Sequence, residues 1–455
     1  MLSVMDRRPA WHSLICTVLL VIAAAVAGDA AAQGQGNAPA QTAPDDGIHL
    51  GVASCAGSTC HGAVKPAANS GVAQDEYLIW SQKDKHHQAY AVLSSELGLR
   101  IAHNLDLPDA KSAQICLDCH ADNMPQDRRG REFDLADGVG CEACHGGAIT
   151  WLGEHLSGAG HKANLAAGMY PTDQPLARAK LCLSCHFGDD RKFVTHQIMG
   201  AGHPPMTFEL DTFTYIQPAH FTVNKSYIAR KGRPNDVQIW AVGQAVDLAK
   251  RMDALTDPKH APQGLDPELV LFDCQSCHHS MKDLQWQKRS SGGLGPGRLR
   301  LYDAGAVMLR VIAARVAPDA AKALSDHMMA LHQATTKDWG EVQREGTAVR
   351  EAANRLIPAL AGHEFSRDDM KALADGVVEA GLNGDATEYS GAQQATMALS
   401  SIVTAMKTFG YAGDEQVKAM HAALGGLNDT LANDQAYDPN AFVKALRGFK
   451  GTLPQ

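Results

Sequence analysis

The sequence predicts a mainly α protein in two parts, a loop-rich N-terminal domain followed by an α-helical bundle. Three observations support this prediction. Five Cys/His motifs crowd into residues 55–278, which leaves too little chain between them for regular sheets. Gly and Ser then dominate residues 290–297, a composition typical of a linker. From Leu299 onward the chain is Ala-rich and free of cysteine, and its apolar residues recur at helical spacing.

The chain begins with the features of a secretory signal. Arg7 and Arg8 precede an apolar run over residues 14–28, too short for a comfortable membrane span, and three alanines then offer a cleavage site. We expect residues 1–32 to be removed during export across the bacterial cytoplasmic membrane, with an uncleaved anchor as the alternative. Residues 33–48, rich in Gln, Ala, Pro and Gly, are predicted to form a flexible leader.

The remaining chain is predicted to form a loop-rich domain over residues 49–289, a linker over 290–298 and a helical domain over 299–455. Helical periodicity also covers residues 76–97 in the first domain. In the second domain we expect helices over residues 300–316, 319–334, 341–360, 367–380, 392–409, 414–424 and 440–449. Ser366 and Asp369 resemble a capping pair. The helical domain carries no metal or nucleotide signature, so a docking module and a packing extension both stay open.

Ten of the eleven cysteines belong to the five motifs, and the eleventh, Cys16, lies in the predicted signal. Four motifs have the form C-x-x-C-H, whereas the first, residues 55–61, has four residues between its cysteines. In such motifs the two thiols bond the vinyl groups of a haem, and the adjacent histidine ligates the iron. Zinc knuckles and thioredoxin-type centres also use C-x-x-C pairs. Neither of them requires a histidine directly after the second cysteine of each pair.

We therefore expect five covalently bound c-type haems as cofactors. The attachment cysteines are Cys55, Cys60, Cys116, Cys119, Cys141, Cys144, Cys182, Cys185, Cys274 and Cys277. The proximal iron ligands are His61, His120, His145, His186 and His278. Only twenty residues separate His120 from Cys141, so the second and third haems are expected to be near neighbours.

A second imidazole on each iron would require five more histidines. The first domain offers eleven outside the motifs: His49, His86, His87, His103, His155, His161, His196, His203, His220, His260 and His279. This surplus favours six-coordinate haems, which suit electron transfer, whereas an open position binds a small molecule. His196 and His203 are seven residues apart, about two helical turns, and must serve different irons. His327, His332, His363 and His421 of the helical domain are predicted to be packing or surface residues.

Several segments resemble multihaem cytochromes of the cytochrome c-554 type. They are Trp80 with residues 85–90, residues 140–146, residues 195–204 with Phe208 and Glu209, and residues 274–279. The resemblance covers residues 50–290 and leaves the helical domain outside it. It implies His86 and His155 as distal iron ligands, in preference to His87 and His161, together with His196, His203 and His220. The type member of the family has four haems, one fewer than expected here.

The resemblance implies a periplasmic carrier that passes single electrons between periplasmic or membrane-associated redox proteins. The alternative is a multihaem oxidoreductase acting on a small nitrogen or sulfur compound at a five-coordinate haem, with the His61 or His278 site as the place to look. Such enzymes often use a C-x-x-C-K motif, which does not occur here, so we favour electron transfer and assign no catalytic residue. The net charge of −9 and the lack of a basic patch argue against a nucleic-acid partner. No stretch of the mature chain is apolar enough for a transmembrane segment.

Overall fold

The computed structural model describes residues 47–65, 72–260, 267–279, 289, 293–295 and 298–454. The predicted signal peptide, most of the predicted leader and most of the predicted linker lie outside these residues. In the part of the chain that is described, helices dominate and only three isolated β-bridges occur, which confirms the prediction of a mainly α protein. The described residues all belong to one compact unit that begins at residue 43.

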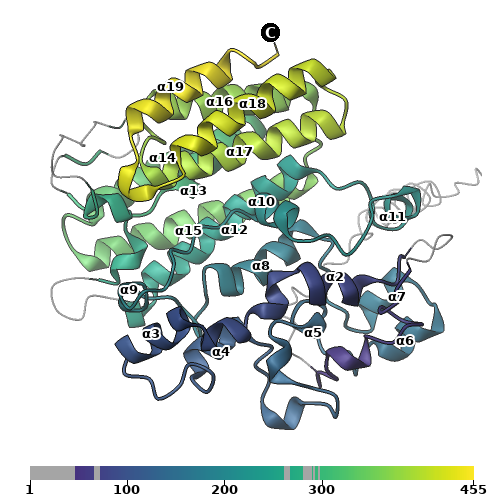
Figure 1. Cartoon of the computed structure of the whole chain (residues 1–455). Coiled ribbons are helices and arrows are strands. Elements are labelled where there is room, and N and C mark those ends of the chain that lie inside the picture. Colours follow the sequence, from purple (N-terminus) through teal and green to yellow (C-terminus); the bar gives the residue numbers. More distant parts are fainter. Residues whose placement is uncertain are drawn as a thin grey trace, which may run out of the picture. The chain divides into compact units, whose positions relative to one another are not determined.

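Short helices joined by loops make up the region that carries the first four motifs (Figure 1). They are α2 (Glu76–Lys83), α3 (Glu96–Asn104), α4 (Gln114–His120), α5 (Cys141–His145), α6 (Leu152–Ser157), α7 (His161–Ala166), α8 (Pro175–His186), α9 (His196–Gly200), α10 (Leu210–Ile216) and α11 (Lys225–Lys231). The short 3-10 turns η2 (Lys85–Gln88) and η3 (Ala91–Ser94) follow α2. This confirms the predicted loop-rich character of the region.

The helical periodicity over residues 76–97 corresponds to several short helical segments instead of one continuous helix. Helix α2 ends where Asp84 takes an extended backbone, with φ −82° and ψ 127°. The carboxylate of Asp84 accepts a hydrogen bond from the backbone N–H of His86 at 3.0 Å and starts a new turn there. Ser95 then caps α3 by accepting from the backbone N–H of Gly98 at 3.1 Å. Because these polar side chains bond nearby backbone groups, they interrupt the helix despite its apolar periodicity.

The seven helices predicted for the C-terminal region are all present. They are α13 (Ala304–Val316), α14 (Pro318–Ala334), α15 (Trp339–Gly362), α16 (Arg367–Leu382), α17 (Tyr389–Thr408), α18 (Asp414–Thr430) and α19 (Pro439–Lys450). The predicted capping pair is also present, since Ser366 and Asp369 form a reciprocal capping box at the start of α16. His332 is buried at 1% exposure on α14, whereas His421 is exposed on α18.

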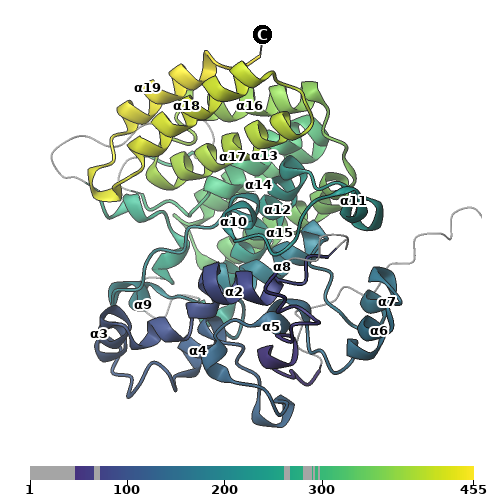
Figure 2. The same cartoon turned by 45° about the vertical axis from the view of Figure 1, so that its right-hand side comes forward.

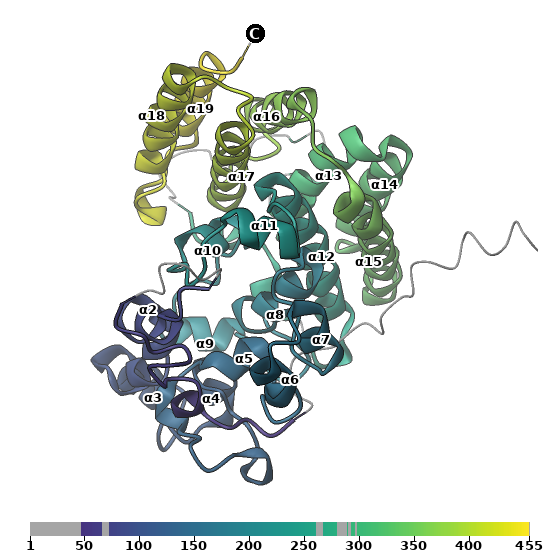
Figure 3. The same ribbon diagram turned by 90° about the vertical axis from the view of Figure 1, so that its right-hand side faces the viewer.

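Two groups of helices share one hydrophobic core. Helix α12 (Asp236–Thr256) packs with α13, α14 and α15 in one group, and α16–α19 form the other (Figure 3). Helices α8 and α10 pack on α12, and α12 and α13 both touch α17 (Figure 2). The core runs from Ala179 to Phe449. Helices on both sides of the predicted linker therefore bury their apolar faces together.

Candidate functional site

Three of the four regular attachment motifs lie on α-helices. Each cysteine pair on α4, α5 and α8 is spaced i, i+3, and residues at this spacing lie on one face of a helix. The histidine that follows ends the helix in all three cases. The fifth motif begins on a 3-10 turn, η8 (Cys274–Ser276), where the backbone N–H of His278 donates to the carbonyl of Cys274 at 2.7 Å. In each of these motifs the local backbone brings the two thiols and the imidazole together.

The loosely spaced first motif closes into a compact turn. The backbone N–H of His61 donates to the carbonyl oxygen of Cys55 at 3.2 Å, and that of Cys60 donates to Gly57 at 2.9 Å. Gly62 follows in close contact, because a Cβ built on it would lie 2.0 Å from the carbonyl oxygen of Ala56. The two extra residues are absorbed by this turn, so Cys55, Cys60 and His61 stay near one another.

Each motif histidine faces one histidine from elsewhere in the chain. Ring centroids lie 5.8 Å apart for His61 and His155, 6.2 Å for His186 and His86, 6.4 Å for His120 and His203, 6.3 Å for His145 and His220, and 6.4 Å for His278 and His196. Two imidazoles on opposite sides of one metal are separated by two metal–nitrogen bonds of about 2 Å each plus the two ring radii, or roughly 6 Å. All five pairs fit this spacing, and they contain the five distal candidates taken from the resemblance.

Nδ1 of His155 lies 3.2 Å from the side-chain nitrogen of Asn164, and hydrogen bonds at Nδ1 orient four further rings of these pairs. His61 and His86 lie 2.9 Å from carboxylate oxygens of Glu76 and Asp84. His120 and His203 donate to the backbone carbonyls of Ala89 at 2.8 Å and Pro204 at 2.9 Å. A partner at one ring nitrogen determines which nitrogen is left for a metal. These four imidazoles therefore present Nε2.

Asp84 connects the end of α2 to the histidine it orients. Burial alone would raise the pKa of this carboxyl group, but hydrogen bonds from His86 and Gln217 lower the pKa to about 2. The carboxylate is therefore ionised at neutral pH and holds the Nδ1 proton of His86. Glu76 acts in the same way on His61, and that contact raises the pKa of the His61 imidazole.

Burial keeps two other motif imidazoles neutral. Desolvation, with a smaller effect of the neighbouring His220, lowers the pKa of His145 to about 3. Desolvation also lowers the pKa of His186 to about 4, with His86 adding to the effect. The ring of Phe208 stacks on His186 at a centroid distance of 4.7 Å. A neutral imidazole is the form that binds a metal, so these environments favour ligation.

Four of the five histidine pairs line one cavity of about 1900 Å³. Pockets for a single drug-sized ligand measure roughly 300–1,000 Å³, so this one has room for more than one large planar group. The cysteines of the first four motifs line it with Trp80 and Trp151, except Cys60. Cationic side chains, Arg129, Arg178 and Lys231, also line it and complement the propionates that c-type haems carry. The cavity, the paired imidazoles and the thiols together fit covalently bound haem.

Contacts between thiols show which attachment sites are neighbours. A hydrogen bond between Cys55 and Cys141 lowers the pKa of the first thiol and raises that of the second. A similar bond between Cys185 and Cys119 lowers the pKa of Cys185 to about 5 and raises that of Cys119. The first motif thus touches the third, and the second touches the fourth. The expected closeness of the second and third sites stays a prediction.

Four of the six histidines that were not chosen as distal ligands contact other groups. The ring of His87 packs edge-on against Trp80 at a centroid distance of 4.7 Å, and Nε2 of His161 lies 3.0 Å from Asp173. His49 is buried, with Nδ1 2.7 Å from the carboxylate of Asp122. His260 donates through Nδ1 to the carbonyl oxygen of Ala254 at 2.9 Å. His103 lies on the exposed face of α3. The contacts of His87, His161, His49 and His260 give those four rings structural roles.

A buried glutamate that sequence reasoning missed joins the first and third motifs. Glu142, inside the third motif, is only 2% exposed and accepts hydrogen bonds from the backbone N–H groups of Leu50 at 2.8 Å, Gly51 at 2.7 Å and Ala148 at 2.7 Å. It therefore ties the chain before Cys55 to the turn after His145. An acidic residue between two attachment cysteines was the signal in the sequence, but two of its partners, Leu50 and Gly51, lie 92 and 91 residues away along the chain.

The attachment motifs and the opposed imidazoles support a c-type cytochrome that acts in electron transfer. Residues 54–146 match the family model described as cytochrome c554 and c-prime. The match spans the first three motifs and supports covalently bound haem and the resemblance found in the sequence. No curated protein and no solved structure matches the chain. Among the described residues, none of the helices is both long and apolar enough to cross a membrane.

Proposed function

We propose that this protein is a periplasmic electron carrier with five c-type haems, each held between two histidines. One observation carries the proposal: every motif histidine faces a second imidazole at the spacing of a shared metal. A six-coordinate iron changes little in geometry on reduction and has no free position for a substrate. This favours electron transfer over the alternative of an oxidoreductase that works at an open iron.

Different side chains of this protein would attach the haems, ligate the irons and orient the ligands. The ten motif cysteines would form the thioether bonds, and the five histidine pairs would supply both axial ligands. When bound, the haems supply one-electron chemistry at iron. Glu76 and Asp84 hold the Nδ1 protons of His61 and His86, which increases the basicity of those ligands. Trp80, Trp151 and Phe208 supply aromatic surface to the cavity that the first four sites share.

The contacts support an order of sites that differs from their order in the sequence. The first and third sites meet at Cys55 and Cys141, and the second and fourth meet at Cys119 and Cys185. Burial raises the pKa of the Cys144 thiol, and the nearby Cys182 and Cys185 raise it further, which links the third site to the fourth. Helix α9 and the turn after it carry His196 and His203, so the fifth site neighbours the second. The proposed chain of sites is first, third, fourth, second, fifth.

The number of haems provides the test of this proposal. The exported, mature protein is expected to contain five haems per chain by pyridine haemochrome assay, and its intact mass should exceed that of the polypeptide by five haems. A variant with Cys55→Ser and Cys60→Ser should contain four, because the compact turn of the first motif is an attachment site. A wild-type protein with four haems, unchanged by these two substitutions, would mean that the first motif binds none.

A further inference from the structure

The fifth attachment motif is built into the C-terminal helical region. The backbone N–H of Asp273, directly before Cys274, donates to the carbonyl oxygen of Arg300 at 2.8 Å, and Phe272 forms an antiparallel bridge with Leu301. Inside the motif, the side-chain oxygen of Gln275 accepts from the backbone N–H of Tyr389 at 2.9 Å. Segments before α13 and at the start of α17 therefore hold the motif from two sides.

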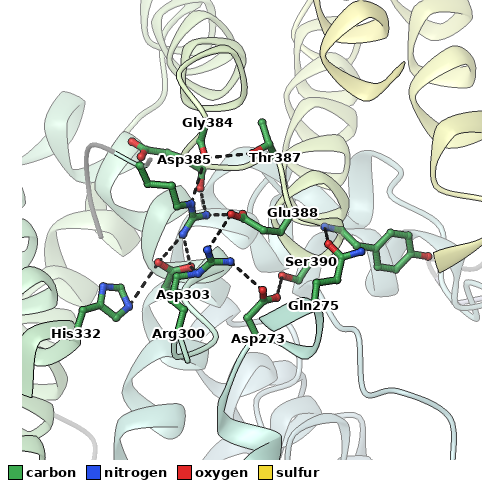
Figure 4. Close-up of polar contacts among 12 residues, drawn as sticks. Asp273, Gln275, Arg300, Asp303, His332, Gly384, Asp385, Thr387, Glu388 and Ser390 are labelled. Atoms are coloured by element: carbon green, nitrogen blue, oxygen red, sulfur yellow. Dashed lines mark hydrogen bonds and ion pairs between the residues drawn. The ribbon is translucent and has the colours of Figure 1, made fainter. Parts of the chain in front are cut away.

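A buried ionic cluster reinforces this attachment (Figure 4). Arg300 lies between two carboxylates, 2.9 Å from Asp273 and 2.9 Å from Glu388. Arg289 binds Glu388 at 2.6 Å and Asp303 at 2.9 Å. The side chains of Asp273 and Asp303 are 4% and 5% exposed. Buried charges persist only when they are paired and hydrogen-bonded, so each member of the cluster depends on the others.

The fifth site differs from the other four in its surroundings. Its cysteines, Cys274 and Cys277, are exposed, and neither they nor His278 line the cavity shared by the other sites. Residues of the C-terminal region hold it, together with His196 on α9 and with Arg289 of the buried cluster. This site therefore has its own scaffold and its own local charges.

We propose that the C-terminal helical region forms the scaffold of the fifth haem site and sets the charge around it, with Arg300 and Asp273 as positioning residues. This inference rests on the proposed five-haem function. It assigns a role to a region that the sequence left open between a docking module and a packing extension. The shared core with α12 means that this region is continuous with the cytochrome part.

The charges of Asp273 and Arg300 determine the direction in which each substitution should shift the midpoint potential of the fifth haem. Asp273 stands directly before Cys274 in the chain, and its carboxylate is buried beside the motif, 2.9 Å from Arg300. A negative charge near an iron stabilises the ferric form, which carries one more positive charge than the ferrous form. Arg300 offsets that charge. Removing the arginine should lower the midpoint potential of the fifth haem, and removing the carboxylate should raise it.

Potentiometric titration of the full-length mature holoprotein tests this. The fifth component is identified by its loss in a Cys274→Ser, Cys277→Ser variant. Arg300→Gln is expected to lower the midpoint potential of that component and Asp273→Asn to raise it, while the other four stay unchanged. Arg315→Gln, which breaks the ion pair with Asp369 on α16, is the matched control and should move none. Loss of only the fifth haem in Arg300→Gln would also support the scaffold.

Unchanged potentials in both variants, with five haems retained, would overturn the inference and leave the proposed function standing. Shifts in the same direction in both variants would also overturn it, because a purely structural disturbance has no charge sign. If Arg300→Gln fails to fold, Asp273→Asn and Ser390→Ala test the role of the Asp273 carboxylate instead. Ser390 donates a hydrogen bond to this carboxylate at 3.1 Å. A wild-type protein without a fifth haem would contradict the proposed function itself.

Discussion

Replacement of His86 by alanine is expected to convert one of the five haems into a high-spin site that binds carbon monoxide. The ring of His86 faces that of His186 at 6.2 Å, so its removal leaves the fourth site with a single imidazole. An iron with an open position binds small ligands. Electron paramagnetic resonance of the oxidised variant should show a new high-spin signal, and the reduced variant should bind about one carbon monoxide per chain.

The adjacent residue supplies a matched control for this experiment. His87 differs from His86 by one position, and its ring packs on Trp80. His87→Ala should therefore keep every haem low-spin and unreactive toward carbon monoxide. If His87→Ala opens a haem and His86→Ala does not, the distal ligand of the fourth site has been assigned to the wrong residue.

Replacement of Arg289 by methionine is expected to reduce the free energy of unfolding by about 3–5 kcal/mol, the range for breaking a buried ion pair from one side. Its guanidinium binds Asp303 and Glu388 and donates to the carbonyl oxygens of Gly384, at 3.1 Å, and Asp385. The pair with Arg289 helps to lower the pKa of Asp303 to about 2 although burial opposes this. The substitution would leave that carboxylate charged and poorly compensated.

Urea denaturation of the mature holoprotein, followed by circular dichroism, measures this loss. Arg355→Met is the control, because Arg355 and Glu351 form an exposed pair at 3.6 Å on α15, and such pairs contribute about 0.5 kcal/mol. An Arg289→Met variant no less stable than this control would show that the cluster adds nothing to stability.

Helices in the C-terminal region were predictable because each signal is local. Apolar residues at helical spacing mark α13–α19, and the Ser366 and Asp369 pair marks where α16 begins. The same rule failed over residues 76–97, where Asp84 and Ser95 bond nearby backbone groups and break the helix. Apolar periodicity alone does not reveal such competing hydrogen bonds.

Spacing alone predicts the attachment residues, because thiols and the proximal imidazole must reach one haem from adjacent positions, and their attachment stays a prediction. The opposed histidines came from the resemblance, and all five lie against a motif histidine. The order of the sites could not be predicted, since it depends on contacts such as Cys119 with Cys185 between distant segments. Glu142 and the cluster around Arg289 were missed for the same reason.

One measurement tests the central claim, that two imidazoles hold each iron. Electron paramagnetic resonance of the oxidised wild-type protein should show only low-spin haem, and titration of the reduced protein with carbon monoxide should leave its visible spectrum unchanged. A high-spin signal, or binding of carbon monoxide to one haem per chain, would contradict the claim and favour an oxidoreductase with an open iron.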